Sequence, residues 1–205
     1  MLKVDQVSRR FDDTILWENV SFEVGPSELV SIVGDNGSGK TTLLKTCSGL
    51  VLPTAGEVTF EGVSTRENWA HLRSSCACCF YPERSFYLRL TGLQNLRFLA
   101  AMQGVEKSLL AERIDALQEM FGVKRVFEFP VRKLSLGQRR ILAVIIAAIL
   151  AEKLLFLDEP TATLDRQNSD AVRALITYVR NRGIGVVCTT HDDDLIRQSL
   201  RAVQL

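Results

Sequence analysis

The chain has 205 residues, which is enough for one domain with a sizeable hydrophobic core and a second lobe. Its 25 lysines and arginines nearly balance 24 aspartates and glutamates, and no basic stripe is interleaved with aromatics, so the charge pattern argues against nucleic acid as the principal partner. The N-terminus has no apolar export core, and the longest apolar stretch, residues 141–151, is about half of the ~20 residues that a membrane span needs, so we expect a soluble, cytoplasmic protein.

The N-terminal part of the chain is dominated by short strand-like segments. These lie at residues 2–4, 15–16, 20–24, 29–33 and 57–60, with turns at Gly25-Pro26 and at residues 53–56. The pattern predicts a small antiparallel sheet beside a nucleotide-binding core.

The loop after the strand at 29–33 fits the phosphate-binding pattern G-x-x-x-x-G-K-[ST], with the residues Gly34, Asp35, Asn36, Gly37, Ser38, Gly39, Lys40 and Thr41. Glycines allow successive backbone N–H groups to turn toward phosphate oxygens, and Lys40 adds a positive charge. Thr41 supplies a hydroxyl for Mg²⁺, and the helix predicted at residues 40–49 directs the positive end of its dipole at the same anion. Because a strand precedes the loop and a helix follows it, we favour an ATP or GTP site over a chance glycine-rich turn.

The five cysteines are an odd number in a chain without a secretion signal, which indicates reduced thiols. Residues 76–79 read Cys-Ala-Cys-Cys and could form a metal or redox patch. No second Cys/His cluster completes a tetrahedral site, so we favour buried small hydrophobic residues there.

Residues from about 90 to 130 change to a helical pattern. Apolar residues recur on helical faces, with Gly104 and Gly122 as stops: Leu93, Leu96, Leu99 and Met102, then Leu109, Leu110, Ile114, Leu117 and Phe121. The pattern predicts a helical lobe inserted into an α/β core.

The core is predicted to resume with a buried helix at 139–150 and a buried strand at 154–157 that ends in Asp158-Glu159. A further helix carries Val172, Leu175, Ile176 and Val179, and a strand at 185–190 leads to His191. Ligands of open α/β sheets bind beyond the carboxyl ends of the strands, so both acids and His191 are expected near the phosphate loop. There Asp158 fits a Mg²⁺-holding acid and Glu159 a general base for the attacking water, although an Asp-Glu-Pro turn can also cap a strand and His191 alone can be an ordinary strand-end histidine.

Residues 134–140 read Leu-Ser-Leu-Gly-Gln-Arg-Arg, and Ser135 taken alone is typical of a helix N-cap. This segment resembles the signature motif of the ATP-binding cassette (ABC) ATPases. The order of the parts along the chain also matches that family: the phosphate loop, the helical lobe, the signature segment, the Asp158-Glu159 strand end, residues 161–165 and His191. The resemblance covers essentially the whole chain, residues 1–205. It implies an α/β fold, namely a P-loop NTPase (RecA-like) core with an N-terminal antiparallel β subdomain and an inserted α-helical subdomain. The core and β subdomain would comprise about residues 1–85 and 139–205, and the helical and signature subdomain about residues 86–138.

The resemblance also implies roles for individual residues. Phe11 resembles the aromatic residue that stacks on adenine, and the phosphate loop with Thr42 is expected to hold the phosphates and Mg²⁺ of ATP. Lys40, Glu159 and His191 are the expected catalytic residues, with His191 contacting the γ-phosphate. Two such domains face each other head to tail in this family. Ser135, Gly137 and Gln138 of one protomer are therefore expected at the nucleotide of the other, with Asp165 at the same interface, in what we expect to be a homodimer.

Three features depart from the family pattern. Leu136 stands where glycine is most frequent, although Ser135 and Gly137 are intact. Glu83 stands where relatives usually have a glutamine that touches Mg²⁺ and the membrane partner; a carboxylate can still meet the metal ion or its water, but it cannot donate hydrogen bonds. The chain also stops about one strand after His191, without the closing hairpin or extension that many relatives carry.

A single cassette of this kind resembles the ATP-binding and ATP-hydrolysing subunit of a membrane transporter whose permease is a separate chain. The short length and the Pro82-Glu83-Arg84 stretch resemble exporters, and residues 85–88 with the helix after them are where we expect the permease to dock. The protein is then peripheral on the inner face of the cell membrane. The alternatives are a soluble ABC protein that acts on ribosomes or DNA, which the single cassette without a coiled-coil insertion disfavours, and a non-hydrolysing regulatory cassette, which Glu159 and His191 disfavour.

Overall fold

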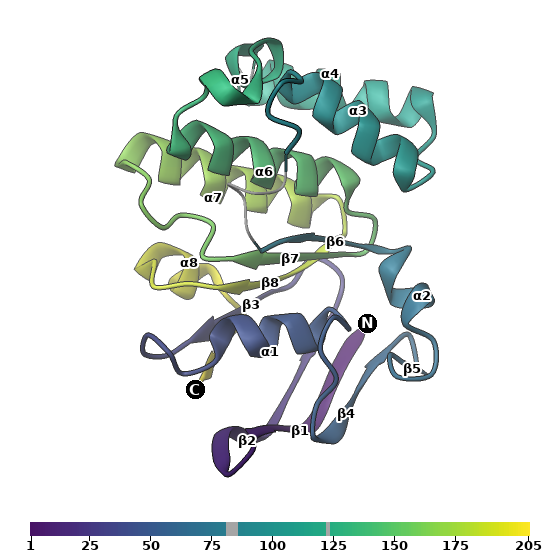
Figure 1. Cartoon of the computed structure of the whole chain (residues 1–205), viewed down its shortest axis with the longest axis vertical. Coiled ribbons are helices and arrows are strands. Elements are labelled where there is room, and N and C mark those ends of the chain that lie inside the picture. Colours follow the sequence, from purple (N-terminus) through teal and green to yellow (C-terminus); the bar gives the residue numbers. More distant parts are fainter. Residues whose placement is uncertain (81–85, 122–123) are drawn as a thin grey trace.

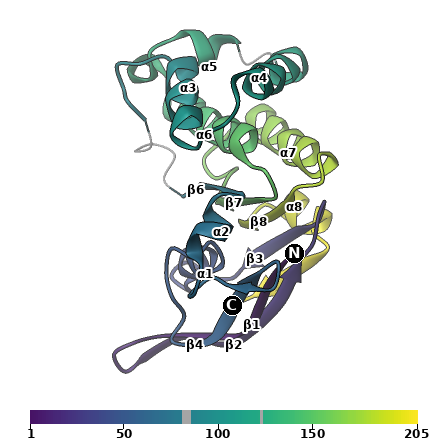
Figure 2. The ribbon, with the colours of Figure 1, turned by 90° about the vertical axis from the view of Figure 1, so that its right-hand side faces the viewer.

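A computed structural model describes residues 1–80, 86–121 and 124–205 of the chain. The strands form two sheets, as predicted: an antiparallel sheet of order β2-β1-β4-β5 and a parallel sheet of order β6-β7-β8-β3-β9. Figure 2 shows the resulting layers, with the helices α3, α4 and α5 at one end, then α6 and α7, the parallel sheet, and α1 and α2 with the antiparallel sheet at the other end.

The antiparallel sheet consists of β1 (Leu2–Phe11), β2 (Thr14–Val24), β4 (Ala55–Phe60) and β5 (Val63–Ser64). The segments predicted at 15–16 and 20–24 are one continuous strand, β2. β1 and β2 form a hairpin that closes at Phe11 and Thr14 and projects from the lower end of the molecule (Figure 1). The buried side chains of this sheet, which include Val4 and Phe22, join the core beneath the parallel sheet.

The parallel sheet is made of β3 (Leu29–Val33), β6 (Cys76–Cys79), β7 (Leu154–Asp158), β8 (Gly185–Thr189) and β9 (Arg201–Gln204). The strands β3, β7 and β8 are buried on both faces, which is why they read as largely apolar runs, whereas β9 at the edge is mostly exposed. Leu155 and Leu157 enter one hydrophobic core, whereas Leu154 and Phe156 enter the other. Because successive side chains of a strand point to opposite faces, the parallel sheet separates two hydrophobic cores.

Different helices cover the two faces of the parallel sheet (Figure 1). The long helices α6 (Leu136–Leu150) and α7 (Arg166–Asn181) pack on the face of Leu155 and Leu157. The helix α1 (Lys40–Cys47) packs on the other face, together with the antiparallel sheet. The short helices α2 (Trp69–Arg73) and α8 (Asp193–Gln198) complete this part of the fold.

The helical lobe contains α3 (Gly92–Met102), α4 (Lys107–Phe121), α5 (Lys124–Glu128) and the 3-10 turn η2 (Val131–Lys133). Thr91 and Gln94 begin α3 with a reciprocal capping box. Apolar residues predicted from the helical pattern, such as Leu96, Leu110 and Ile114, share one core with α6. Gly104 follows α3 with a positive φ of 72°, as expected of a helix stop, while Gly122 lies outside the described residues.

The structure also differs from the sequence predictions in other places. Residues 76–79, for which no strand was predicted, form β6, which pairs with β7. In the described part of the chain, no group of three or more His, Cys, Asp or Glu residues is arranged to hold a metal ion. α6 begins at Leu136 rather than at residue 139, because Ser135 caps it. The C-terminal segment forms both α8 and β9. Within the described ranges, none of the helices has the length and apolar character to cross a membrane.

Candidate active site

The phosphate loop joins the carboxyl end of β3 to the first residue of α1. Gly39 ends the loop with a φ of 94° and offers no side chain to cap the helix. The Nζ atom of Lys40 lies 2.8 Å from the carbonyl oxygen of Gly34 and 3.0 Å from that of Asp35, so its ammonium group bridges the loop. The sequence predicted this loop because each of its constraints is local to a few residues.

Two observations indicate that the phosphate loop can bind an anion. The N–H groups in the first turn of α1 receive no side-chain cap, and the dipole of the helix is positive at this end. The Ser38 hydroxyl is buried without a hydrogen-bond partner in the described residues. Phosphate oxygens supply the acceptors that both sets of donors need.

Asp158 lies at the carboxyl end of β7, where two hydroxyl groups donate to its carboxylate. The Oγ1 atom of Thr41 is 2.9 Å from Oδ1 and 2.9 Å from Oδ2, and Oγ1 of Thr189 is 2.6 Å from Oδ1. Hydroxyl and carboxylate oxygens are the ligands that Mg²⁺ prefers in proteins, so Thr41 and Asp158 fit this ion. The sequence analysis missed Thr189; a polar residue that ends a buried apolar strand beside β7 was the available signal.

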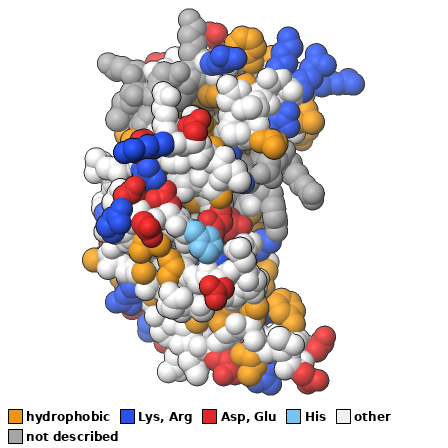
Figure 3. Space-filling view, turned by 90° about the vertical axis from the view of Figure 1, so that its left-hand side faces the viewer, with side chains coloured by type: hydrophobic (Ala, Val, Ile, Leu, Met, Phe, Trp, Pro, Cys, Tyr) orange, Lys and Arg blue, Asp and Glu red, His pale blue; other side chains and the backbone are white. Residues whose placement is uncertain are grey.

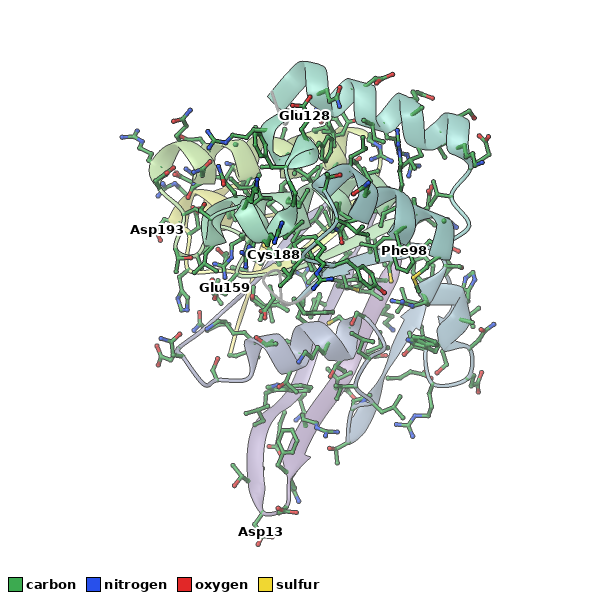
Figure 4. All side chains as sticks on the ribbon, turned by 45° about the horizontal axis from the view of Figure 1, so that its top comes forward. Asp13, Phe98, Glu128, Glu159, Cys188 and Asp193 are labelled. Atoms are coloured by element: carbon green, nitrogen blue, oxygen red, sulfur yellow. The ribbon has the colours of Figure 1, made fainter. Side chains whose placement is uncertain are left out.

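Glu159 and His191 lie at the same edge of the sheet as the phosphate loop. Figure 4 shows Glu159 at this edge, and Figure 3 shows acidic side chains gathered near the middle of the corresponding face. The Nε2 atom of His191 lies 3.5 Å from Oε1 of Glu159 and 3.1 Å from Nζ of Lys40. A carboxylate, a histidine and the loop lysine are thus brought together from three separate segments of the chain.

Ser135, Gly137 and Gln138 lie on the other side of the parallel sheet from α1. Ser135 caps α6: its Oγ accepts a hydrogen bond from the Gln138 backbone N at 3.2 Å, and the Gln138 Oε1 accepts from the Ser135 backbone N at 3.0 Å. Leu136 beside them is 66% exposed. Because α6 and α1 cover opposite faces of the sheet (Figure 1), the structure does not bring this corner to the phosphate loop of its own chain.

Three of the remaining predicted site residues, Phe11, Asn36 and Asp165, are exposed. Phe11 is 49% exposed at the end of β1, and the Arg9 guanidinium lies 4.5 Å from its ring centroid. Asp165 caps α7 by accepting from the Asn168 backbone N at 2.8 Å. Asn36 and Thr42 are exposed and half-buried, respectively, in the phosphate loop and the first turn of α1. Glu83 lies outside the described residues.

The chain is similar in sequence to known ATP-binding proteins of transporters. The chain is 33% identical over 195 residues to the "Cytochrome c biogenesis ATP-binding export protein CcmA" of Vibrio vulnificus, covering 94% of this chain and 93% of that protein. It is 29% identical over 191 residues to the "Probable multidrug ABC transporter ATP-binding protein YbhF" of Escherichia coli, covering 93% of this chain. The chain spans only 33% of the length of YbhF.

Solved structures share the fold. A structure described as the ATP binding subunit of an ABC transporter superposes with a TM-score of 0.87 at 25% identity, covering 100% of this chain and 85% of the other. The dimeric, post-hydrolysis cassette MJ0796 bound to ADP and Pi superposes with a TM-score of 0.83 at 24% identity, covering 100% of this chain and 94% of that one.

Residues 17–162, the span from β2 to the turn after Glu159, match the family described as ABC transporter. This span includes the phosphate loop, the helical lobe, the corner formed by Ser135, Gly137 and Gln138 (the Ser135 corner) and the Asp158-Glu159 strand end. The chain therefore belongs to the ABC transporter family and has the fold of its ATP-binding subunits.

Proposed function

We propose that this chain hydrolyses ATP as a head-to-tail homodimer and thereby powers an exporter whose permease is a separate polypeptide. The observation that carries the proposal is the meeting of Lys40, Thr41, Asp158, Glu159 and His191 at one sheet edge. In this assignment Lys40 and His191 contact the γ-phosphate, and Glu159 orients and deprotonates the attacking water. Thr41 and Asp158 hold Mg²⁺, which when bound neutralises charge on the phosphates.

We assign the binding of the rest of the nucleotide to the phosphate loop and to Phe11. The exposed aromatic ring of Phe11 suits stacking on adenine, and the loop with Thr42 supplies backbone N–H groups to the phosphates. We also propose that residues 1–85 and 139–205 act as the nucleotide-binding core and residues 86–138 as the helical and signature subdomain. Glu83 remains a proposed contact of the metal ion or its water.

A second polypeptide supplies the Ser135 corner in this proposal. The N-terminus of α6 and the exposed Ser135 that caps it lie on the side of the parallel sheet away from α1. An anion that this corner contacts must therefore be held by another molecule. A second copy of the chain, with Asp165 at the same interface, meets this need through a two-fold axis.

Complementation between two inactive variants tests the shared site. Lys40→Ala removes the loop charge, and Ser135→Ala removes the hydroxyl of the corner, so each variant alone should be nearly inactive. Mixed dimers contain one site with both parts intact, and an equimolar mixture should recover roughly a quarter of wild-type ATPase activity. No recovery in the mixture, with dimers formed in both preparations, would contradict the head-to-tail arrangement.

The permease is proposed to dock beside the helical lobe. Tyr87 and Leu88 are 55% and 45% exposed, Phe98 of α3 is 40% exposed, and the rings of Tyr87 and Phe98 lie 4.9 Å apart. Phe86 instead packs against the core, and Ser85 lies outside the described residues. A groove of about 510 Å³ lies between α2 and the end of α3, and its lining residues include the exposed Trp69 and Met102. Such a surface suits an apolar helix of a membrane protein.

Co-purification tests the transporter assignment. The wild-type chain should isolate with membranes together with an integral membrane protein, and Tyr87→Glu should weaken this association while ATP binding persists. Leu200→Glu, which changes another exposed apolar residue away from the helical lobe, is the matched control. Recovery of the chain only in ribosomal or DNA-bound fractions would favour the soluble ABC alternative instead.

The export direction is supported by the similarity to CcmA over nearly the full length of both chains. Transport assays in vesicles that contain the co-purified membrane protein would test it. ATP-dependent movement of cargo toward the side that carries the cassette would contradict export.

A further inference from the structure

The buried hydroxyl of Thr189 joins the two acidic residues at the end of β7. Thr189 is the last residue of β8, lies opposite Asp158 in the parallel sheet, and is 0% exposed. Its Oγ1 atom lies 2.6 Å from Oδ1 of Asp158 and 2.9 Å from the backbone N of Glu159. One side chain therefore contacts both the carboxylate assigned to the metal ion and the backbone of the residue assigned as base.

The direction of these hydrogen bonds follows from the chemistry of the partners. A backbone N–H can only donate and a carboxylate can only accept, so the single hydroxyl proton of Thr189 points at Asp158. Thr41 donates to the same carboxylate from α1. Two donors from different elements thus hold the Asp158 side chain, and Thr189 is the donor that belongs to the sheet.

The same residue supports an unusual backbone conformation at Glu159. The φ of Glu159 is 45°, in the left-handed region that residues other than glycine rarely adopt. The Glu159 N–H has two acceptors, both on Thr189: the carbonyl oxygen at 3.1 Å and Oγ1 at 2.9 Å. This turn places the Glu159 carboxylate 3.5 Å from His191.

We propose that Thr189 is a positioning residue for ATP hydrolysis, which orients the Asp158 carboxylate and holds the turn that aims Glu159. The inference rests on the proposed function, in which Asp158 supports Mg²⁺ and Glu159 acts on water. Among the described residues, the Thr189 hydroxyl forms its hydrogen bonds with Asp158 and Glu159, and not with Lys40 or the phosphate loop. Its hydroxyl should therefore matter for turnover and for the effect of Mg²⁺, and not for nucleotide binding without the metal ion.

Thr189→Val removes the hydroxyl and keeps the β-branched shape, whereas Thr189→Ser keeps the hydroxyl. Loss of a hydrogen bond to a charged group should lower kcat of Thr189→Val by roughly tenfold or more, with KM for ATP changed by less than about threefold. Thr189→Ser should retain most of the wild-type kcat. Thr189→Ala is the second test variant, because it removes the hydroxyl without placing a new methyl group against the carboxylate.

Thr46→Val is the matched control for loss of a buried hydroxyl. Thr46 is 1% exposed, and its Oγ1 donates to the Thr42 carbonyl oxygen at 3.0 Å within α1. Thermal denaturation of both variants separates general destabilisation from the proposed effect. We expect Thr46→Val to lose stability while its kcat stays close to that of the wild type.

Calorimetry of ATP binding supplies a readout besides activity. In EDTA, Thr189→Val and Thr189→Ala should bind ATP with wild-type affinity, and the gain in affinity on adding Mg²⁺ should be smaller than in the wild type. If the wild type hydrolyses ATP and the Thr189 variants keep both its kcat and its gain in ATP affinity on adding Mg²⁺, this inference is wrong while the proposed function stands. Equal damage in Thr189→Ser and Thr189→Val would also overturn it, because the hydroxyl would then not be the cause. A wild-type chain that does not hydrolyse ATP would instead overturn the proposed function, and the inference with it.

Discussion

Gly39 is packed against the β2 strand so closely that an added methyl group should destabilise the protein. A Cβ atom at this position would lie 2.6 Å from Cδ2 and 2.6 Å from Cγ of Leu16, and 2.9 Å from Nε1 of Trp17. Carbon atoms do not approach to this distance without displacement of one group. Gly37 in the same loop has a similar φ of 87°, yet a Cβ atom there would meet nothing within 4 Å. The two glycines thus separate a backbone effect from a packing effect.

The magnitudes follow from these two terms. Alanine in the left-handed region costs about 1–2 kcal/mol, which both Gly37→Ala and Gly39→Ala incur. Forcing extra atoms into a packed core costs a further ~1–3 kcal/mol, which only Gly39→Ala incurs. The restriction of the unfolded chain by alanine is the same for both variants and cancels in the difference. We therefore expect Gly39→Ala to unfold about 1–3 kcal/mol more easily than Gly37→Ala.

Urea unfolding without nucleotide, followed by circular dichroism, measures this difference. Leu16→Ala in the Gly39→Ala background should restore part of the lost free energy, because it removes the side chain that the methyl group would meet. Equal free energies of unfolding for the two alanine variants would refute the packing of the loop on β2. Additive effects of Leu16→Ala and Gly39→Ala would refute it as well.

Three further predictions concern the site and a buried thiol. Glu159→Gln should keep ATP binding, lower kcat by about 10²–10⁴-fold and accumulate an ATP-bound dimer in size-exclusion chromatography, and turnover close to wild type would contradict its role as base. Lys40→Ala should weaken ATP binding by roughly tenfold or more, because a charged donor to the phosphates is lost, and unchanged affinity in calorimetry would contradict this. Burial raises the pKa of Cys188 to about 12, so at pH 8 it should stay protonated and react with iodoacetamide far more slowly than in urea. Rapid labelling of Cys188 in the folded protein, read by mass spectrometry, would show that it is not buried as described.

Local sequence was sufficient for the phosphate loop and for the order of the elements around it. The loop is a contiguous pattern of glycines, a lysine and a threonine between a strand and a helix, and each residue acts through its own backbone or side chain. The buried strands predicted at 29–33, 154–157 and 185–190 were recognisable because both of their faces are covered and most of their residues are therefore apolar. Placing Asp158, Glu159 and His191 at one edge needed only the rule that parallel strands end together.

Tertiary structure decided what depends on pairing between distant segments. Cys76–Cys79 carries too short and too ambiguous a pattern to predict a strand, and it becomes β6 only by pairing with β7, where Cys76 lies opposite Leu154. The contact of Thr189 with Asp158 and Glu159 likewise arises from the register of β8 on β7. The separation of Ser135 from the phosphate loop exists only because a sheet lies between α6 and α1. A short motif is enough to predict the chemistry of its own side chains. The residues that surround and orient those side chains come from distant segments, and these segments are brought together by the burial of apolar surface across the whole fold.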